Sequence, residues 1–282
     1  MACLHCGDTG WKPVEVEGVQ QVVRCDCWRE ALSGKLLDDA RIPPRYRKCS
    51  FGNFVVYPNE KLQKAVVRAQ AFADAFPVVE QGLFFVGSPG IGKTHLAVAV
   101  LRAVIRRCGA RGIFRNTSEL LKEIRGTYNP MVGPTESGVL RPVIESELLV
   151  LDDIGTEKTS EWVLETLNLI VNTRYNQRRP TIFTSNYEEY PESHGESLGD
   201  KVGFRMLSRL HEMCEFLEFR GADYRYFEHS KGPPTAADLL NMYKNQPSRP
   251  REIGRRASGQ LKARFRESKS DVSWPGGKAG TS

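Results

Sequence analysis

The chain has 282 residues, enough for one substantial domain with appendages. Hydrophobic residues make up 40% of it, but no run approaches the ~18 apolar residues that a membrane-spanning helix needs. The formal net charge of +6 belongs to the C-terminal end, because residues 231–282 hold 11 Lys and Arg against 4 Asp and Glu. With no basic-then-apolar signal segment at the N-terminus, we expect a cytoplasmic protein without a membrane partner.

Four of the seven cysteines lie in the first 27 residues, as two close pairs. This spacing predicts a small zinc-binding module over residues 1–28, because four thiolates suit a tetrahedral zinc site. So short a segment cannot bury enough apolar surface to fold alone, and a metal would stabilise it. The expected ligands are Cys3, Cys6, Cys25 and Cys27. His5 is an alternative ligand, and an iron–sulfur site or reduced thiols are the alternatives to zinc.

A helix over residues 30–40 and the prolines of Ile42-Pro43-Pro44 fill residues 29–50, which we interpret as a helix and linker before the main domain. The main domain is expected over residues 51–229. It begins with a helix over residues 59–76, whose apolar residues recur at three-and-four spacing and therefore face a core.

The strand 83–86 runs into the most informative stretch of the chain, Gly-Ser-Pro-Gly-Ile-Gly-Lys-Thr, and a helix follows it. This is a phosphate-binding loop in its required context, with backbone N–H groups and a helix N-terminus facing the phosphates. We expect Lys93 to reach the β- and γ-phosphates and the Thr94 hydroxyl to bind Mg²⁺. The expected nucleotide-binding residues are Gly87, Ser88, Pro89, Gly90, Ile91, Gly92, Lys93, Thr94 and His95.

A second strand is expected over residues 112–115, a helix from residue 117 and a loop over residues 126–142. The apolar run before Asp152 and Asp153 then predicts a buried parallel strand with two carboxylates at its C-terminal end, where ligands bind in α/β sheets. We expect Asp152 to hold Mg²⁺ through water and Asp153 to polarise the attacking water. After a helix over residues 162–175, another strand ends at Asn186, whose side chain can hydrogen-bond that water.

A helix over residues 203–213 and an edge strand over residues 214–220 complete the expected fold. From residue 230 to 282 the composition shifts to Pro, Gly, Ser, Lys and Arg, which predicts a basic, mostly disordered tail with one short helix over residues 235–244. This tail is either a solvated extension or a DNA-contacting arm. The order of the motifs predicts an α/β, P-loop NTPase architecture, a parallel sheet flanked by helices.

Several segments together resemble the helicase loaders of the DnaC/DnaI type and the related IstB transposition ATPases, which are AAA+ proteins. They are Ile-Pro-Pro-Arg-Tyr (42–46), Gly-Ser-Pro-Gly-Ile-Gly-Lys-Thr-His-Leu-Ala (87–97), Leu-Leu-Val-Leu-Asp-Asp-Ile-Gly (148–155), Asn-Thr-Arg-Tyr (172–175), Pro-Thr-Ile-Phe-Thr-Ser-Asn (180–186), Ser-Arg-Leu (208–210) and Gly-Ala-Asp-Tyr-Arg (221–225). The resemblance covers roughly residues 41–226, and the cysteine-rich N-terminus is similar to the zinc-binding regions of some loaders.

The resemblance implies Asp152 and Asp153 as the Walker B pair, Asn186 as sensor 1, Arg209 as an arginine finger offered to a neighbouring subunit, and Arg225 as a sensor-2-like contact to ATP. It implies an ATPase that oligomerises with itself, binds single-stranded DNA and delivers the replicative DNA helicase. The second Walker B carboxylate is Asp where many AAA+ enzymes have Glu, so we expect slow turnover. The alternatives are an ATPase helper of a transposase and a nucleotide-gated adaptor with little hydrolysis. Arg174 and Arg205 are candidates for a subunit interface, or for surface or structural roles.

Overall fold

The structure is a computed structural model, and it describes residues 3–7, 9–16, 18–128, 135–191, 195–227 and 234–245. The chain divides into two units, residues 1–246 and residues 247–282, and the described residues all belong to the first. The predicted basic tail therefore lies outside the described residues, apart from its short helix, which is present as α9 (Ala236–Lys244).

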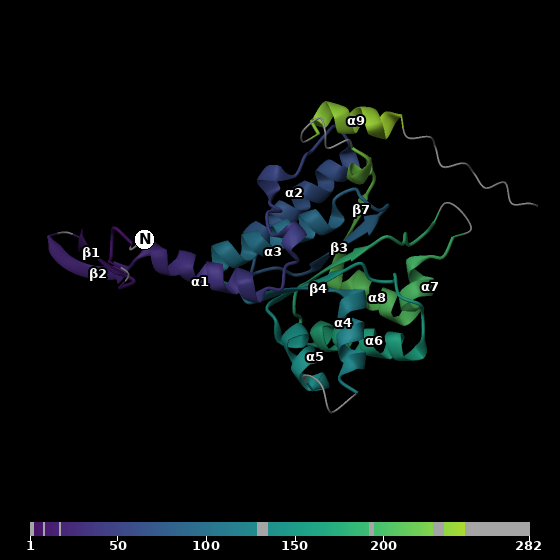
Figure 1. Cartoon of the computed structure of the whole chain (residues 1–282), viewed down its shortest axis with the longest axis horizontal. Helices are drawn as coiled ribbons and strands as arrows, with labels where there is room; N and C mark the ends of the chain where they lie inside the picture. The colour runs from purple at the N-terminus through teal and green to yellow at the C-terminus, as the bar shows by residue number, and fades with distance from the viewer. Residues whose placement is uncertain are drawn as a thin grey trace, which may run out of the picture. The chain divides into compact units, whose positions relative to one another are not determined.

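A two-stranded antiparallel ribbon precedes the main sheet (Figure 1). Its strands are β1 (Trp11–Val16) and β2 (Val19–Arg24), with Trp11 opposite Arg24 and Val16 opposite Val19. The helix α1 (Asp26–Asp39) follows at once, earlier than the predicted start at residue 30, and packs against α3 (Lys93–Cys108). The ribbon at the predicted zinc module is thus joined directly to the helix that contacts the main domain.

The main sheet has five parallel strands in the order β4-β5-β6-β3-β7. Residues of β3, β5 and β6 are all buried, as expected for strands covered on both faces. The predicted parallel α/β sheet, with its last strand at the edge, is confirmed. The strands are β3 (Gly82–Gly87), β4 (Gly112–Asn116), β5 (Leu148–Asp152), β6 (Thr181–Ser185) and β7 (Cys214–Phe219).

Helices cover both faces of this sheet (Figure 1). One core contains buried residues of α2, α3 and α9 with one face of the sheet, and the other contains residues of α4, α5, α6, α7 and α8 with the opposite face. The remaining bounds are α2 (Glu60–Ala75), α4 (Thr117–Gly126), α5 (Glu136–Glu145), α6 (Glu161–Asn176), α7 (Leu198–Val202) and α8 (Phe204–Met213), with short 3₁₀ turns at Pro44–Tyr46, Phe51–Asn53 and Tyr224–Tyr226.

The predicted loop over residues 126–142 is wrong in its second half, because α5 begins at Glu136. The Thr135 side chain accepts a hydrogen bond from the Gly138 backbone and caps this helix. Val139, Leu140 and Val143 are buried, so burial of an apolar face outweighs the glycine and proline that suggested a loop. Residues 129–134 of that prediction lie outside the described residues.

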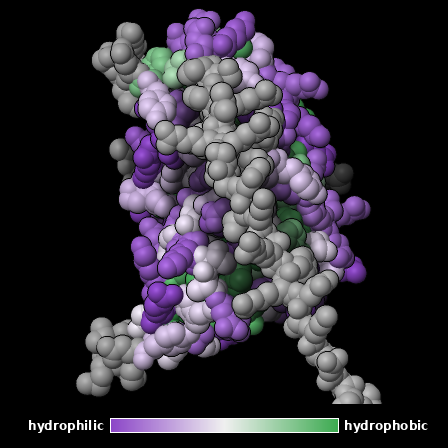
Figure 2. Space-filling view, turned by 90° about the vertical axis from the view of Figure 1, so that its right-hand side faces the viewer, coloured by the Kyte–Doolittle hydropathy of each residue, from purple (hydrophilic) through white to green (hydrophobic). Residues whose placement is uncertain are grey.

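The residues that Figure 2 colours by hydropathy are mostly hydrophilic, and hydrophobic residues are visible among them at only a few places. Among the described helices, none has both the length and the apolar character needed to cross a membrane.

Candidate functional site

The loop between β3 and α3 contains two glycines at which a side chain would collide with neighbouring segments. A Cβ on Gly90 would lie 1.7 Å from Oδ1 of Asp223, and a Cβ on Gly92 would lie 2.8 Å from the Phe54 ring. Both residues also have φ in the left-handed region, at 77° and 99°. The loop therefore needs glycine both for its backbone conformation and for the close approach of the segments beside it.

Lys93, the first residue of α3, is buried, with 6% of its surface exposed. Its Nζ donates hydrogen bonds to the carbonyl oxygens of Gly87 and Ser88, both at 2.7 Å, and to Oδ1 of Asn186 at 2.8 Å. Burial lowers the pKa of Lys93 to about 8, while the nearby carboxylates of Asp153 and Asp152 oppose that shift. The ammonium is thus held at the centre of the site by oxygens alone.

Thr94 and Asp152 lie side by side, although they come from α3 and β5. The Thr94 hydroxyl donates to Oδ1 of Asp152 at 2.8 Å, and the Thr184 hydroxyl donates to the same oxygen at 2.7 Å. Burial raises the pKa of the Asp152 carboxyl, and the two hydroxyl groups counteract that shift. A hydroxyl beside a carboxylate offers the oxygen ligands that Mg²⁺ prefers, so this pair fits the predicted magnesium site.

Asp153 has a φ of 64°, so its backbone turns away from the direction of β5. Its N–H donates to the Thr184 hydroxyl at 2.8 Å, and its Oδ1 accepts a hydrogen bond from the Asn186 amide at 2.5 Å. Burial raises the pKa of Asp153 and the Lys93 ammonium lowers it. Asn186 therefore bridges Lys93 and Asp153, with its amide oxygen on one and its amide nitrogen on the other.

These residues line a cavity of about 560 Å³. The sequence-predicted residues on its wall are Gly90, Ile91, Gly92, Lys93, Thr94, His95, Asp152, Asp153, Asn186 and Arg225. His95 is joined through Nε2 to the carbonyl oxygen of Ser50 at 3.2 Å and to Oδ1 of Asn53 at 3.0 Å, so it links α3 to the preceding segment.

Arg209 is the one predicted catalytic residue that does not line this cavity among the described residues. It lies on α8 and is partly exposed, and its Nη1 is buried without a hydrogen-bond partner among the described residues. A role for this arginine on a neighbouring subunit stays a prediction.

Sequence reasoning missed several residues on the cavity wall. Thr184 binds both Asp152 and the Asp153 backbone, and its position near the end of β6, two residues before Asn186, was the available signal. Arg45 and Tyr46, from the Ile-Pro-Pro-Arg-Tyr segment, also line the cavity, as do Tyr57 and Leu239. No sequence motif marked Tyr57 or Leu239.

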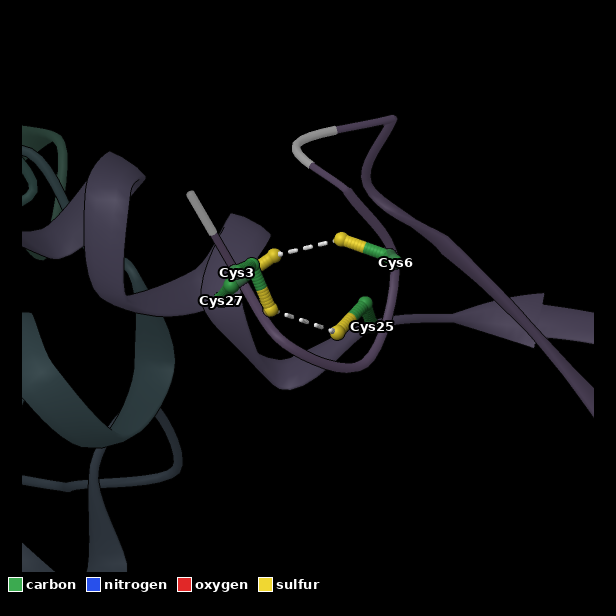
Figure 3. Close-up of side chains that lie close together, drawn as sticks. All are labelled: Cys3, Cys6, Cys25 and Cys27. Carbon is green, nitrogen blue, oxygen red and sulfur yellow. Dashed lines mark hydrogen bonds between the residues drawn. The ribbon is translucent and has the colours of Figure 1, made fainter. Parts of the chain in front are cut away.

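The four N-terminal cysteines converge at the base of the ribbon (Figure 3). Their sulfur atoms all lie within 4.8 Å of one another, with Cys3 Sγ 3.8 Å from Cys25 Sγ and Cys6 Sγ 3.2 Å from Cys27 Sγ. Zn–S bonds of ~2.3 Å in a tetrahedron place sulfurs roughly 3.8 Å apart, so the cluster fits zinc. The Cys27 side chain lowers the pKa of Cys6 to about 7, which favours a thiolate there. Within the described residues, His5 is not part of the cluster.

Comparison with protein families gives a match over residues 59–232 to the family described as "IstB-like ATP binding protein". This match covers more than half of the chain. The replicative helicase loader DnaC of Escherichia coli (strain K12) is 29% identical over 163 residues, which are 57% of this chain and 65% of that protein. The uncharacterized protein YdaV of the same strain is 31% identical over 176 residues, which are 62% of this chain and 69% of that protein. The chain thus spans slightly less than two thirds of the length of DnaC.

Solved structures also resemble this chain. The crystal structure of the DnaC helicase loader matches with a TM-score of 0.56 and 34% identity, covering 63% of this chain and 100% of that one. The crystal structure of DnaI matches with a TM-score of 0.53, covering 65% of this chain and 94% of that one, and at 24% identity it supports the fold alone. The predicted resemblance to the DnaC and IstB proteins is confirmed.

Proposed function

This chain belongs to the IstB-like ATP binding protein family, and from this membership we propose that it is an ATP-dependent loader of a replicative DNA helicase. The relative from Escherichia coli is named a replicative helicase loader. The observation that carries the proposal beyond the family is the four-cysteine cluster on a ribbon outside the matched region, which gives the ATPase domain a separate element to hold a partner.

Some site residues bind the phosphates and Mg²⁺, and others activate the water that attacks ATP. The loop from Gly87 to Thr94 binds the phosphates, and the Lys93 ammonium exchanges its carbonyl partners for phosphate oxygens. Thr94 and Asp152 hold Mg²⁺, which neutralises phosphate charge when bound. The distance of 2.8 Å between their oxygens supports this assignment.

Asp153 orients the attacking water and accepts its proton as the bond from the γ-phosphorus to the bridging oxygen of ADP breaks. Asn186 holds the Asp153 carboxylate through its amide. Arg225 lines the cavity, and its positive charge lowers the pKa of both Lys93 and Asp153. It contacts the phosphates of the ATP that is bound to its own chain. Arg209 acts on the ATP of a neighbouring copy, so hydrolysis requires self-assembly.

Single-stranded DNA binds at α4 and the start of α6. Lys122 and Arg125 lie on α4, and the Arg125 guanidinium is 4.6 Å from the ring centre of Trp162 on α6. The Trp162 indole N–H donates to the Tyr128 hydroxyl at 2.8 Å. Positive charge beside stacking aromatic rings is the combination that single-stranded nucleic acid needs.

Zinc-bound residues 3–27 hold the helicase. Trp11 on β1 and Trp28 at the start of α1 are partly exposed, and the Arg24 guanidinium lies 5.0 Å from the ring centre of Trp11 and 4.2 Å from that of Trp28. Apolar rings of this kind are enriched in protein interfaces. Such a surface, held in shape by the metal, supports a role in partner binding.

The test is capture of the replicative helicase of the same cell by the full-length chain, with ATP and with ADP. The matched variants are Cys25→Ser, which removes a cluster thiol, and Cys108→Ser, which changes an exposed thiol on α3. We expect nucleotide-sensitive capture by the unmodified chain and by Cys108→Ser, and loss of capture with Cys25→Ser. A point change is preferable to deletion of residues 1–40, because α1 packs against α3.

Absence of capture in every nucleotide state would contradict the loader function. The family description then favours the second candidate, an ATPase helper of a transposase, and the next bait is a transposase encoded nearby.

A further inference from the structure

The cavity of about 560 Å³ is lined by both charged and apolar side chains. Lys93, Thr94 and Asp152, which bind the phosphates and Mg²⁺ in the proposed function, define its phosphate end. Apolar side chains also line the cavity, namely Val55, Tyr57, Leu62, Ile91 and Leu239. The base is the apolar, planar part of a nucleotide, so these side chains are the ones available to pack against it.

Three of these apolar residues come from outside the region that matches the family. Val55 and Tyr57 precede the start of the match at residue 59, and Leu239 follows its end at residue 232. The family match therefore accounts for the phosphate end but not for the whole apolar wall. The helix α9, which carries Leu239, is a feature of this chain beyond the matched domain.

Tyr57 is held firmly where it meets the cavity. Its hydroxyl accepts a hydrogen bond from the Ala222 backbone at 2.9 Å, and a Cβ on Gly221 would lie only 2.2 Å from that oxygen. Its ring centre is 6.2 Å from that of Tyr243 on α9. The two aromatic rings thus join the segment before the matched domain to the helix after it.

The helix α9 presents Leu239 to the same wall. Thr235 and Asp238 form a capping box that fixes the start of the helix. Leu239 is 4% exposed and belongs to the core cluster that also contains Tyr57, Leu62 and Ile91. Leu240 and Tyr243 pack against this cluster from the same helix.

We propose that α9 closes the base end of the nucleotide site and that Leu239, together with Tyr57, contacts the purine base and determines the affinity for it. This inference rests on the proposed ATP binding and adds to it a part of the chain outside the family domain. Phosphate binding depends on the loop and Lys93, so the two ends can be tested separately with different ligands.

The experiment measures binding of ATP and of inorganic tripolyphosphate, each with Mg²⁺, to full-length variants by calorimetry. Truncation of Leu239 to alanine removes apolar contact with the base, so we expect Leu239→Ala to weaken ATP binding about tenfold and to leave tripolyphosphate binding unchanged. The control is Leu240→Ala, a change on the same helix at a residue outside the described cavity wall, which should leave both affinities unchanged.

A second variant, Leu239→Trp, narrows the base end and should likewise weaken ATP but not tripolyphosphate. Retained tripolyphosphate binding shows that each variant is folded. Equal losses for both ligands, or unchanged ATP affinity in both Leu239 variants, would overturn the role of α9 while leaving ATP binding intact. If the unmodified chain bound no ATP, the proposed function would fail together with this inference.

Discussion

Lys93 Nζ lies 2.8 Å from Oδ1 of Asn186, although the two residues are 93 positions apart in the chain. The same asparagine donates to Asp153, so one amide connects the ammonium that binds phosphate to the carboxylate that activates water. If a phosphate oxygen replaces the Asn186 oxygen as the acceptor of this Lys93 N–H, the Asn186 oxygen becomes free to accept a hydrogen bond from that water. Nucleotide binding would in this way prepare the site for hydrolysis.

The pH dependence of ATP binding should report the protonation of Lys93. Burial lowers its pKa to about 8, so the ammonium predominates below that pH. A bound phosphate favours the ammonium and raises this pKa, which means that binding takes up a proton only when the pH is above about 8. We expect ATP affinity to be constant below this pH and to fall by up to about tenfold per pH unit above it.

Calorimetry in two buffers of different ionisation enthalpy measures this proton uptake directly. Lys93→Ala should bind ATP too weakly to show it. Strong binding by that variant, or affinity that does not change between neutral and alkaline pH, would contradict the role of this ammonium.

Replacement of Asp153 by asparagine should separate binding from hydrolysis. Asn tolerates the left-handed φ of 64° at this position, so Asp153→Asn should keep the local backbone. Loss of the general base should lower the single-turnover rate of phosphate release by roughly 10²- to 10⁴-fold, with ATP affinity changed little. The rate of phosphate release and the ATP affinity are both measured, for the variant and for the unmodified chain. A variant that hydrolyses ATP at the normal rate would remove Asp153 from the mechanism.

The sequence predicts the parts of this molecule that depend on local pattern. The apolar runs of β3, β5 and β6, the glycine spacing and the polar residues at the strand ends were sufficient to predict the sheet and its ligand-binding edge, because each signal lies within a few residues. The cap and apolar face of α5 were missed because Gly138 and Pro142 outweigh them locally. Tyr57 and Leu239 lie 182 positions apart and meet only through tertiary packing, so no local pattern could bring them to one wall.

From the sequence, Arg174 could be assigned to a subunit interface, to the surface or to a structural role, and the structure places it in the interior with 0% exposure. Its guanidinium donates to carbonyl oxygens at the end of α5, those of Val143 at 2.9 Å and Ile144 at 3.0 Å, and to the Pro180 carbonyl at 2.6 Å. Burial lowers the pKa of Arg174 to about 9. It therefore ties α5 and α6 to the start of β6.

Arg174→Met should destabilise the fold, because it leaves those buried carbonyl groups without donors. We expect a loss of about 3 kcal/mol in the free energy of unfolding, measured by urea denaturation. Arg106→Met, on the exposed side of α3, is the matched control and should change stability by less than about 0.5 kcal/mol. Similar losses in both variants would show that the buried hydrogen bonds of Arg174 are unimportant.

The cysteine cluster should bind one zinc ion whose removal affects the ribbon but not the nucleotide site. A chelator, or Cys25→Ser, should increase proteolysis within residues 3–27 and leave ATP affinity unchanged, because the residues that line the nucleotide cavity come from residue 43 onward. Metal analysis by mass spectrometry supplies the occupancy, with Cys108→Ser as the control that keeps the ion. Visible absorbance from iron, or absence of metal in the unmodified protein, would exclude the zinc assignment.

Single-stranded DNA affinity should depend on Trp162. Its ring lies 4.6 Å from the Arg125 guanidinium and is hydrogen-bonded to Tyr128, which is 57% exposed. A stacked base typically contributes ~1–3 kcal/mol, so Trp162→Ala should weaken binding of an oligothymidine by roughly 5- to 150-fold at fixed salt. Arg125→Ala should also reduce the salt dependence of binding, since it removes a positive charge.

Fluorescence anisotropy with a labelled oligothymidine, in the presence of ATP, measures both effects. The control is Tyr190→Ala, which removes an aromatic ring that is 83% exposed and lies outside α4 and α6. Because stacking is local, this control should bind DNA like the unmodified chain. Equal weakening of DNA binding in the Trp162 and Tyr190 variants would contradict a DNA site at α4 and α6, because loss of either aromatic ring would then have the same effect. Unchanged binding in Trp162→Ala would place the DNA path on another surface.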